Sequence, residues 1–153
     1  MSVFDRAAAH IRTISPYQPG KPISELAREM GLQESSIVKL ASNENPLGMS
    51  PHARAAALAA IDEVPRYPDG NGFELKQAVM RHHDINIDQI VLGNGSNDVL
   101  EMVARALLGP GSSAVYSKHA FAVYPLATLA AGACGIEVPA RNFGCDLDAM
   151  RAA

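Results

Sequence analysis

The second half of the chain alternates between short apolar runs and longer amphipathic stretches. Gln89–Gly93 is a mostly apolar run that ends in glycine, which predicts a strand buried on both faces. Two further short apolar runs predict strands at Ala114–Ser117 and Gly135–Pro139, and helical spacing predicts helices at Asp98–Leu108 and Phe121–Ala131. Strands that alternate with helices predict an α/β fold, with a mainly parallel sheet and right-handed crossover helices.

The pattern in the first half of the chain is different and predicts loops and separate helices. Three prolines and one glycine fall close together around residues 15–22, which predicts an extended arm. Ser50 followed by Pro51 is a strong helix start, since serine caps the helix and proline fits its first turn. We expect helices at Ser24–Met30, from Pro51 to about Glu63 and at Phe73–His82, and a short strand at Ile37–Ala41.

The end of the sequence changes this picture. A new helix begins near Asp146, and the sequence stops at Ala153. A parallel sheet that ends after about three strands is unusually small for an α/β protein. We therefore expect the chain to be a fragment, with a truncated sheet.

Composition excludes several classes of function. With 48% hydrophobic residues, 19% charged residues and a net charge of −3, the chain is typical of a folded globular protein, and not of a nucleic-acid binder with a basic stripe. It has no apolar run of about 18 residues, so we expect no membrane helix. Residues 1–10 lack the apolar region of a secretory signal. The two cysteines, Cys134 and Cys145, form neither a disulfide framework nor a metal site, which favours a cytoplasmic location.

The segment Gly93–Asp98 carries the clearest chemical signal. It follows a predicted strand and opens a predicted helix, so unpaired amides and the positive end of the helix dipole would face a ligand there. This favours a phosphate site at Gly95, Ser96 and Asn97. A plain helix cap at Ser96 or Asn97 explains the residues equally well. A dinucleotide site is disfavoured, because its glycine fingerprint would require glycine where Asp98 stands.

A second candidate follows the next predicted strand. In open α/β sheets, ligands lie beyond the carboxyl ends of the strands, which would place Phe121 near the same ligand as Ser96. An aromatic ring there could stack on a heteroaromatic ligand. Taken alone, Phe121 is better explained as a core residue, and the neighbouring His119 as a surface residue rather than an acid or base.

Five strings of sequence, in this order and with natural spacing, resemble one enzyme family. They are SPYQPGKP, KLASNENPLG, RYPDGNGFELK, IVLGNGSNDVLEM and FAVYPLATLAAGA. Together they are similar to the N-terminal part of the histidinol-phosphate aminotransferases, a family of fold type I enzymes that depend on pyridoxal 5′-phosphate (PLP). The resemblance implies an arm and part of a small domain over residues 1–50, and the first part of the PLP-binding large domain over residues 51–153.

The resemblance also implies roles for single residues at the cofactor. Gly95, Ser96 and Asn97 match the turn that holds the PLP phosphate. Phe121 matches the aromatic residue that stacks on the pyridine ring, where many members carry tyrosine. Tyr67 matches a tyrosine that reaches the partner subunit's cofactor in a homodimer; packing against Pro68 is the alternative.

Two residues match positions near the substrate. Tyr17 matches an arm residue close to the substrate phosphate, and its alternative is an anchor for the proline-rich arm. Asn45 belongs to a loop near the substrate amine and carboxylate, and turn formation before Pro46 explains it equally well. No metal is implied.

The implied reaction converts L-histidinol phosphate and 2-oxoglutarate to imidazole-acetol phosphate and glutamate, a step of histidine biosynthesis. The family's Schiff-base lysine falls beyond residue 153, so no catalytic residue is expected within this chain, and the chain alone should be inactive. Two alternatives stay open: a related PLP enzyme for a phosphorylated amine, similar to threonine-phosphate decarboxylase, and a non-catalytic phosphate- or nucleotide-binding module.

Overall fold

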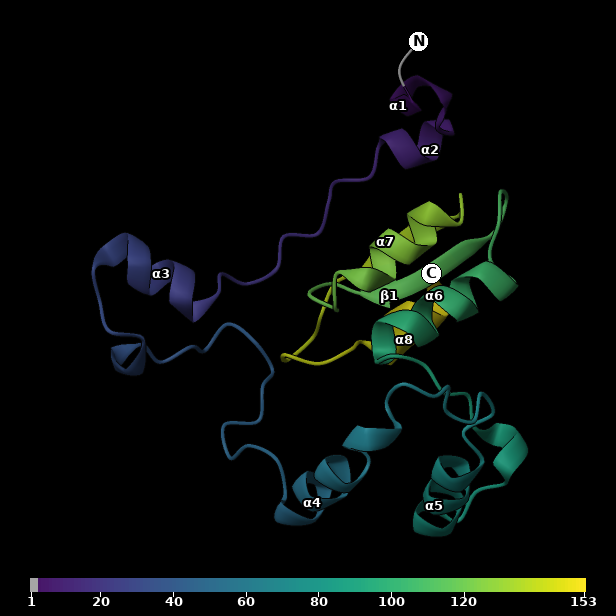
Figure 1. Ribbon diagram of the computed structural model, residues 1–153. Coiled ribbons are helices and arrows are strands. Elements are labelled where there is room, and N and C mark those ends of the chain that lie inside the picture. Colours follow the sequence, from purple (N-terminus) through teal and green to yellow (C-terminus); the bar gives the residue numbers. More distant parts are fainter. Residues whose placement is uncertain (1–2) are drawn as a thin grey trace. The chain divides into compact units, whose positions relative to one another are not determined.

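The computed structural model describes residues 3–153 and divides into two compact units. The first unit combines the N-terminal segment up to Tyr17 with Leu75–Ala153, and the second is Gln18–Glu74 (Figure 1). The predicted boundary at residue 50 between the arm and a large domain stays a prediction. None of the helices within residues 3–153 is long and apolar enough to cross a membrane.

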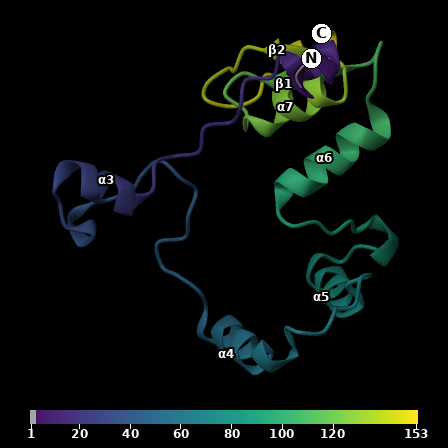
Figure 2. The same cartoon turned by 45° about the horizontal axis from the view of Figure 1, so that its top comes forward.

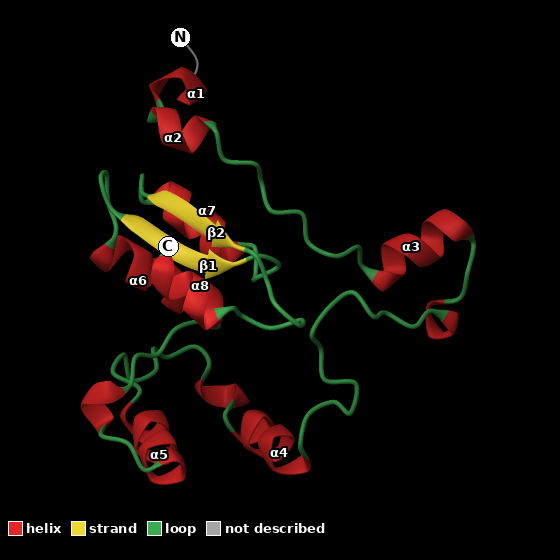
Figure 3. Cartoon of the chain, turned by 180° about the vertical axis from the view of Figure 1, so that it is seen from behind, coloured by secondary structure: helices red, strands yellow, loops and turns green. Residues whose placement is uncertain are grey.

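A small parallel sheet lies at the centre of the first unit. Strand β1 (Ser113–Ser117) pairs in parallel with β2 (Cys134–Val138), with Ser113 opposite Cys134 and Ser117 opposite Val138. Helix α7 (Val123–Ala130) connects the two strands and runs alongside them (Figures 2 and 3). These elements confirm the predicted α/β fold class and two of the predicted strands.

The core of this unit forms where two helices meet. Helix α6 (Ser96–Leu107) packs against α7 through Ala104, Val123 and Ala127, and Leu100 and Leu108 flank the contact. Alanines let the two helix backbones approach closely. Helix α8 (Leu147–Ala152), predicted to begin near Asp146, contacts β1.

The N-terminal arm is partly helical. Helices α1 (Val3–Arg6) and α2 (Ala9–Arg12) precede an extended stretch through the proline-rich segment. Helix α2 contacts α7, and His10 lies beside Gly132, just after α7. A Cβ atom on Gly132 would lie 3.4 Å from Cε1 of His10, which is ordinary van der Waals contact. The arm is extended around residues 15–22, as predicted, and two short helices that the sequence did not predict precede this stretch.

Two predicted strands are absent from residues 3–153. A 3₁₀ turn, η3 (Ile87–Gln89), and an irregular segment follow α5 (Phe73–His83) where the strand Gln89–Gly93 was expected. Ile90 is buried, but Val91 is 67% exposed. A strand needs a hydrogen-bonding neighbour, and these residues pair with none of the described strands. Ile37–Ala41 is likewise irregular for the same reason.

The second unit consists of short helices joined by loops. Helix α3 (Ile23–Met30) ends at Gly31, which adopts the left-handed conformation, as the glycine predicts. The 3₁₀ turn η1 (Glu34–Ser36) follows. Helix α4 (Pro51–Ala59) begins at Ser50 as predicted, and continues into the 3₁₀ turn η2 (Ile61–Glu63).

Candidate functional site

The predicted phosphate turn leads directly into α6. Gly95 precedes the helix with φ 83° and ψ 173°, a combination that residues other than glycine essentially avoid. A Cβ atom at Gly95 would meet no atom within 4 Å, so the space beside the turn is open. The glycine is required by the backbone conformation, and it leaves room for a ligand.

The first amides of α6 lack an acceptor within the described chain. Gly95 provides no side-chain cap, and neither Ser96 nor Asn97 uses its side chain as one. The main-chain N–H groups of Ser96 and Asn97 have no hydrogen-bond acceptor among residues 3–153. The interpretation of Ser96 or Asn97 as a plain helix cap is therefore wrong. Two donors remain at the positive end of the helix dipole.

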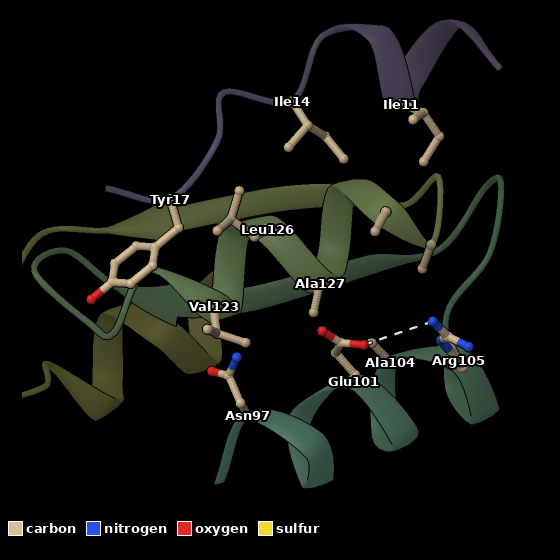
Figure 4. A pocket seen from close by; sticks show the side chains of 12 residues that line it. Ile11, Ile14, Tyr17, Asn97, Glu101, Ala104, Arg105, Val123, Leu126 and Ala127 are labelled. Carbon is tan, nitrogen blue, oxygen red and sulfur yellow. Dashed lines mark ion pairs between the residues drawn. The ribbon is translucent and has the colours of Figure 1, made fainter. Parts of the chain in front are cut away.

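A cavity of about 590 Å³ reaches this helix start. Asn97 and Tyr17 both line it, Asn97 from the first turn of α6 and Tyr17 from the arm (Figure 4). Most of the remaining wall is apolar, and Glu101 and Arg105 form an ion pair at 3.7 Å on one side. The other lining residues are Ile11, Ile14, Ala104, Val123, Leu126, Ala127, Ala130 and Ala131.

Two of the predicted site residues are in contact. The rings of Tyr17 and Phe121 meet edge to face, with centroids 6.3 Å apart and planes at 80°. Phe121 is 45% exposed, so its interpretation as a core residue is wrong. It follows the carboxyl end of β1, as predicted, with part of its surface accessible. The contact also gives Tyr17 the anchoring role that was its alternative.

The remaining two predicted residues belong to the second unit. The Asn45 side chain accepts a hydrogen bond from the Leu47 amide at 3.0 Å and donates one to the Gly48 carbonyl at 2.9 Å. This confirms that Asn45 forms a turn. Tyr67 is fully exposed, so it does not pack against Pro68. The structure therefore groups Gly95, Ser96, Asn97, Tyr17 and Phe121 in one unit, and leaves Asn45 and Tyr67 in the other.

The four lysines of the chain do not resemble an activated amine. Lys21 is paired with Glu25 and Glu29, and the hydrogen bond that it donates to Glu29 raises the pKa of Lys21, which opposes the neutral form that a nucleophile needs. Lys39 is paired with Glu44 at 3.2 Å. Lys118 and His119 are exposed and line a separate cavity of about 340 Å³ beyond the strand ends. Lys76 lies on α5, outside both cavities.

Sequence reasoning missed two features of this site. Ile11 and Ile14 line the cavity from the arm, and their spacing of three residues is the only sequence signal for it. Asp98 was considered only as the residue that stands in place of a glycine in the dinucleotide fingerprint. In the structure its Oδ2 accepts a hydrogen bond from the Asn94 amide at 3.0 Å.

Comparison with known proteins finds similar sequences over nearly the whole chain. The family model for aminotransferase class I and II matches residues 35–153. The chain is 68% identical to histidinol-phosphate aminotransferase 2 of Nitrosospira multiformis, covering 98% of this chain and 38% of that protein. It is 62% identical to histidinol-phosphate aminotransferase 1 of Dechloromonas aromatica, covering 100% of this chain and 42% of that protein. The chain thus spans about two fifths of the length of these curated relatives.

A solved structure shares the fold. The histidinol-phosphate aminotransferase of Sinorhizobium meliloti, crystallised in complex with pyridoxal 5′-phosphate, superposes with a TM-score of 0.79 at 24% identity, covering 99% of this chain and 39% of that one. This confirms the α/β arrangement described above. Because the family model matches most of the sequence, the chain belongs to the aminotransferase class I and II family.

Proposed function

We propose that the natural protein carrying this chain is a PLP-dependent aminotransferase that acts on L-histidinol phosphate. It would transfer the amino group to 2-oxoglutarate, giving imidazole-acetol phosphate and glutamate in histidine biosynthesis. The observation that carries this proposal is the high identity with curated histidinol-phosphate aminotransferases along nearly the whole chain.

The start of α6 fits the phosphate of PLP. The amides of Ser96 and Asn97 supply two unpaired donors, and Gly95 leaves the approach open. Ser96 and Asn97 also bring polar side chains to the same turn. A phosphate bound here would satisfy donors that the chain itself leaves without acceptors.

Phe121 fits the ring of the cofactor. Its accessible surface can stack on a planar heteroaromatic group, and the Tyr17 ring contacts the phenyl ring edge to face. When bound, PLP supplies an electron sink for transfer of the amino group. The residues of this chain would bind the phosphate, orient the ring and cover one side of it.

We infer further roles for three residues from the family pattern. Tyr17 would also lie near the substrate phosphate, and the Asn45 turn near the substrate amine and carboxylate. Tyr67 would contact the cofactor of a partner subunit in a homodimer, and its full exposure leaves it accessible for that contact. A cytoplasmic location, and a division into an arm with part of a small domain (1–50) and the start of a large domain (51–153), belong to the same proposal.

The lysine that holds the cofactor would come from outside these 153 residues. Lys21 and Lys39 are paired with carboxylates, and Lys118 lies in a different cavity from Asn97. We therefore expect the 153 residues to provide the phosphate turn and the stacking ring, without transaminase turnover of their own.

An assay on the natural protein tests this proposal. We expect PLP-dependent formation of glutamate from 2-oxoglutarate with L-histidinol phosphate as amino donor, and no release of carbon dioxide from threonine phosphate. Intact mass shows whether the protein extends beyond the 16.2 kDa of this chain. Turnover and a borohydride-trapped lysine adduct in a protein of only that mass would contradict the assignment of the lysine, and a lack of any transaminase activity in a longer protein would contradict the function.

A further inference from the structure

The carboxylate of Asp98 points away from the helix to which it belongs. Asp98 is the third residue of α6, a position from which acidic side chains often reach back to the amide of the capping residue. Here Oδ2 accepts instead from the amide of Asn94, one residue further back, at 3.0 Å. The carboxylate therefore ties the loop before the helix to the first turn of the helix.

Gly93 makes this contact sterically possible. A Cβ atom at Gly93 would lie 3.2 Å from both Cβ and Oδ2 of Asp98, and 2.9 Å from Cγ2 of Val99. The Gly95 amide completes the turn with a hydrogen bond to the Gly93 carbonyl at 2.9 Å. Two hydrogen bonds and one close approach thus determine the path of residues 93–95.

This turn places the donors that the proposed function uses. Because the amides of Asn94 and Gly95 are occupied by Asp98 and Gly93, those of Ser96 and Asn97 are the first without an acceptor. The half-buried Asp98 carboxylate accepts a hydrogen bond from the loop amide of Asn94, and it does not cap the amides of Ser96 and Asn97.

We propose that Asp98 is a positioning residue, whose carboxylate oxygen holds the Gly93–Gly95 turn so that the amides of Ser96 and Asn97 converge on the cofactor phosphate. This rests on the proposed function. The role comes from the acceptor oxygen of Asp98, whereas its negative charge opposes an anion bound close by. Geometry and charge therefore act in opposite directions on the affinity for phosphate.

Two substitutions separate these effects in the natural protein. Asp98→Asn keeps an acceptor oxygen and removes the charge, so we expect PLP to bind as tightly as in the wild type or about twofold more tightly. Asp98→Ala removes both, and we expect PLP affinity to fall about fivefold, as for one net hydrogen bond. Asp148→Ala is the matched control, because it removes an exposed carboxylate from the first turn of α8.

Titration with PLP and with pyridoxal, which lacks the phosphate, supplies the readout. The proposal predicts that Asp98→Ala weakens binding of PLP while pyridoxal binding stays unchanged. Tighter PLP binding in both Asp98 variants would show that only charge matters, and an equal loss for both ligands would show general damage to the fold; either result overturns the proposal, as does unchanged PLP binding in Asp98→Ala.

Two further outcomes keep the test decisive. If Asp98→Ala does not fold, Asp98→Asn still decides, because a loss of PLP affinity in that variant would mean that the charge itself is required. If the wild-type protein does not prefer PLP to pyridoxal, the phosphate site of the proposed function fails, and Asp98 loses this role with it. Failure in the variants alone contradicts only the role of Asp98.

Discussion

The starts of α4 and α6 differ in how their first amides are satisfied. At α4, Ser50 accepts a hydrogen bond from the Ala53 amide at 3.1 Å, and Pro51 removes a further donor from the first turn. At α6, Gly95 offers no side chain, and the amides of Ser96 and Asn97 have no acceptor within residues 3–153. The first arrangement stabilises a helix by itself, whereas the second leaves donors for a ligand.

The same contrast appears within the first unit. Asp146 caps α8 by accepting from the Ala149 amide at 3.1 Å, whereas Asp98, in α6, directs its carboxylate to the preceding loop. The chain therefore uses serine and aspartate to cap other helices, but at α6 the capping position is occupied by glycine. An uncapped helix start is a feature of this site and not of the whole protein.

Substituting Gly95 should have the largest effect on this contrast. Gly95→Ala places a side chain at φ 83°, and we expect the free energy of unfolding to fall by about 1–3 kcal/mol. PLP affinity should fall about tenfold as the turn relaxes, since tenfold corresponds to about 1.4 kcal/mol. Chemical denaturation and PLP titration of the natural protein measure both quantities.

Gly109→Ala is the control for this substitution. Gly109 has open space around its Cα and no left-handed conformation, so the variant should behave as the wild type. A Gly95→Ala protein with unchanged stability and unchanged PLP affinity would show that the conformation of this turn is unimportant.

Two serines should respond in opposite ways. Ser50→Ala removes a cap and should lower the free energy of unfolding by about 1 kcal/mol without changing PLP affinity. Ser96→Ala should leave stability within about 0.5 kcal/mol of the wild type. It should weaken PLP binding about threefold, because a hydroxyl beside the phosphate is lost. If both variants lose stability and neither loses affinity, the two helix starts are equivalent and the contrast is wrong.

A smaller effect is expected at the aromatic pair. Tyr17→Leu removes the ring edge against Phe121, a contact of about 0.5 kcal/mol, and should weaken PLP and pyridoxal binding equally, about twofold. Tyr17→Phe keeps the ring and should leave both affinities unchanged. A loss confined to PLP would place Tyr17 at the cofactor phosphate instead of the ring.

The smallest effect concerns alkaline pH. Burial, followed by the negative charges of Glu137 and Cys134, raises the pKa of Tyr116. A raised pKa in the folded state contributes stability below the unfolded pKa of about 10, and this contribution is lost as pH rises through the folded value. Unfolding followed from pH 8 to about 11 should show a steeper loss for the wild type than for Tyr116→Phe. Parallel stability curves for the two proteins would contradict the raised pKa of Tyr116. The stability measurements on the two helix starts should be made below about pH 8, where this titration does not contribute.

Local sequence signals predicted those parts of the fold that depend on local interactions. Ser50–Pro51 marked the start of a helix correctly, because a cap involves residues only a few positions apart, and the left-handed Gly31 ends α3 through the same kind of local interaction. The segment Gln89–Gly93 was wrongly predicted as a strand, because a strand depends on a neighbour that the segment itself does not specify.

The candidate site divides in the same way. The tight turn at Gly95 was predicted correctly from its place before a helix, since its backbone conformation demands glycine, and its role at the cofactor stays a prediction. The contact between Tyr17 and Phe121 joins residues over a hundred positions apart in sequence, and only the resemblance to a family had suggested a shared site. The hydrogen bond from Asn94 to Asp98 was missed, because the same carboxylate could equally have capped the helix.

A crystal structure of the natural protein with PLP tests the central claim most directly. We predict phosphate oxygens about 2.7–3.2 Å from the main-chain nitrogens of Ser96 and Asn97, with the pyridine ring against Phe121. A phosphate bound away from α6, or Ser96 and Asn97 amides that donate to a protein carboxylate instead, would contradict the account.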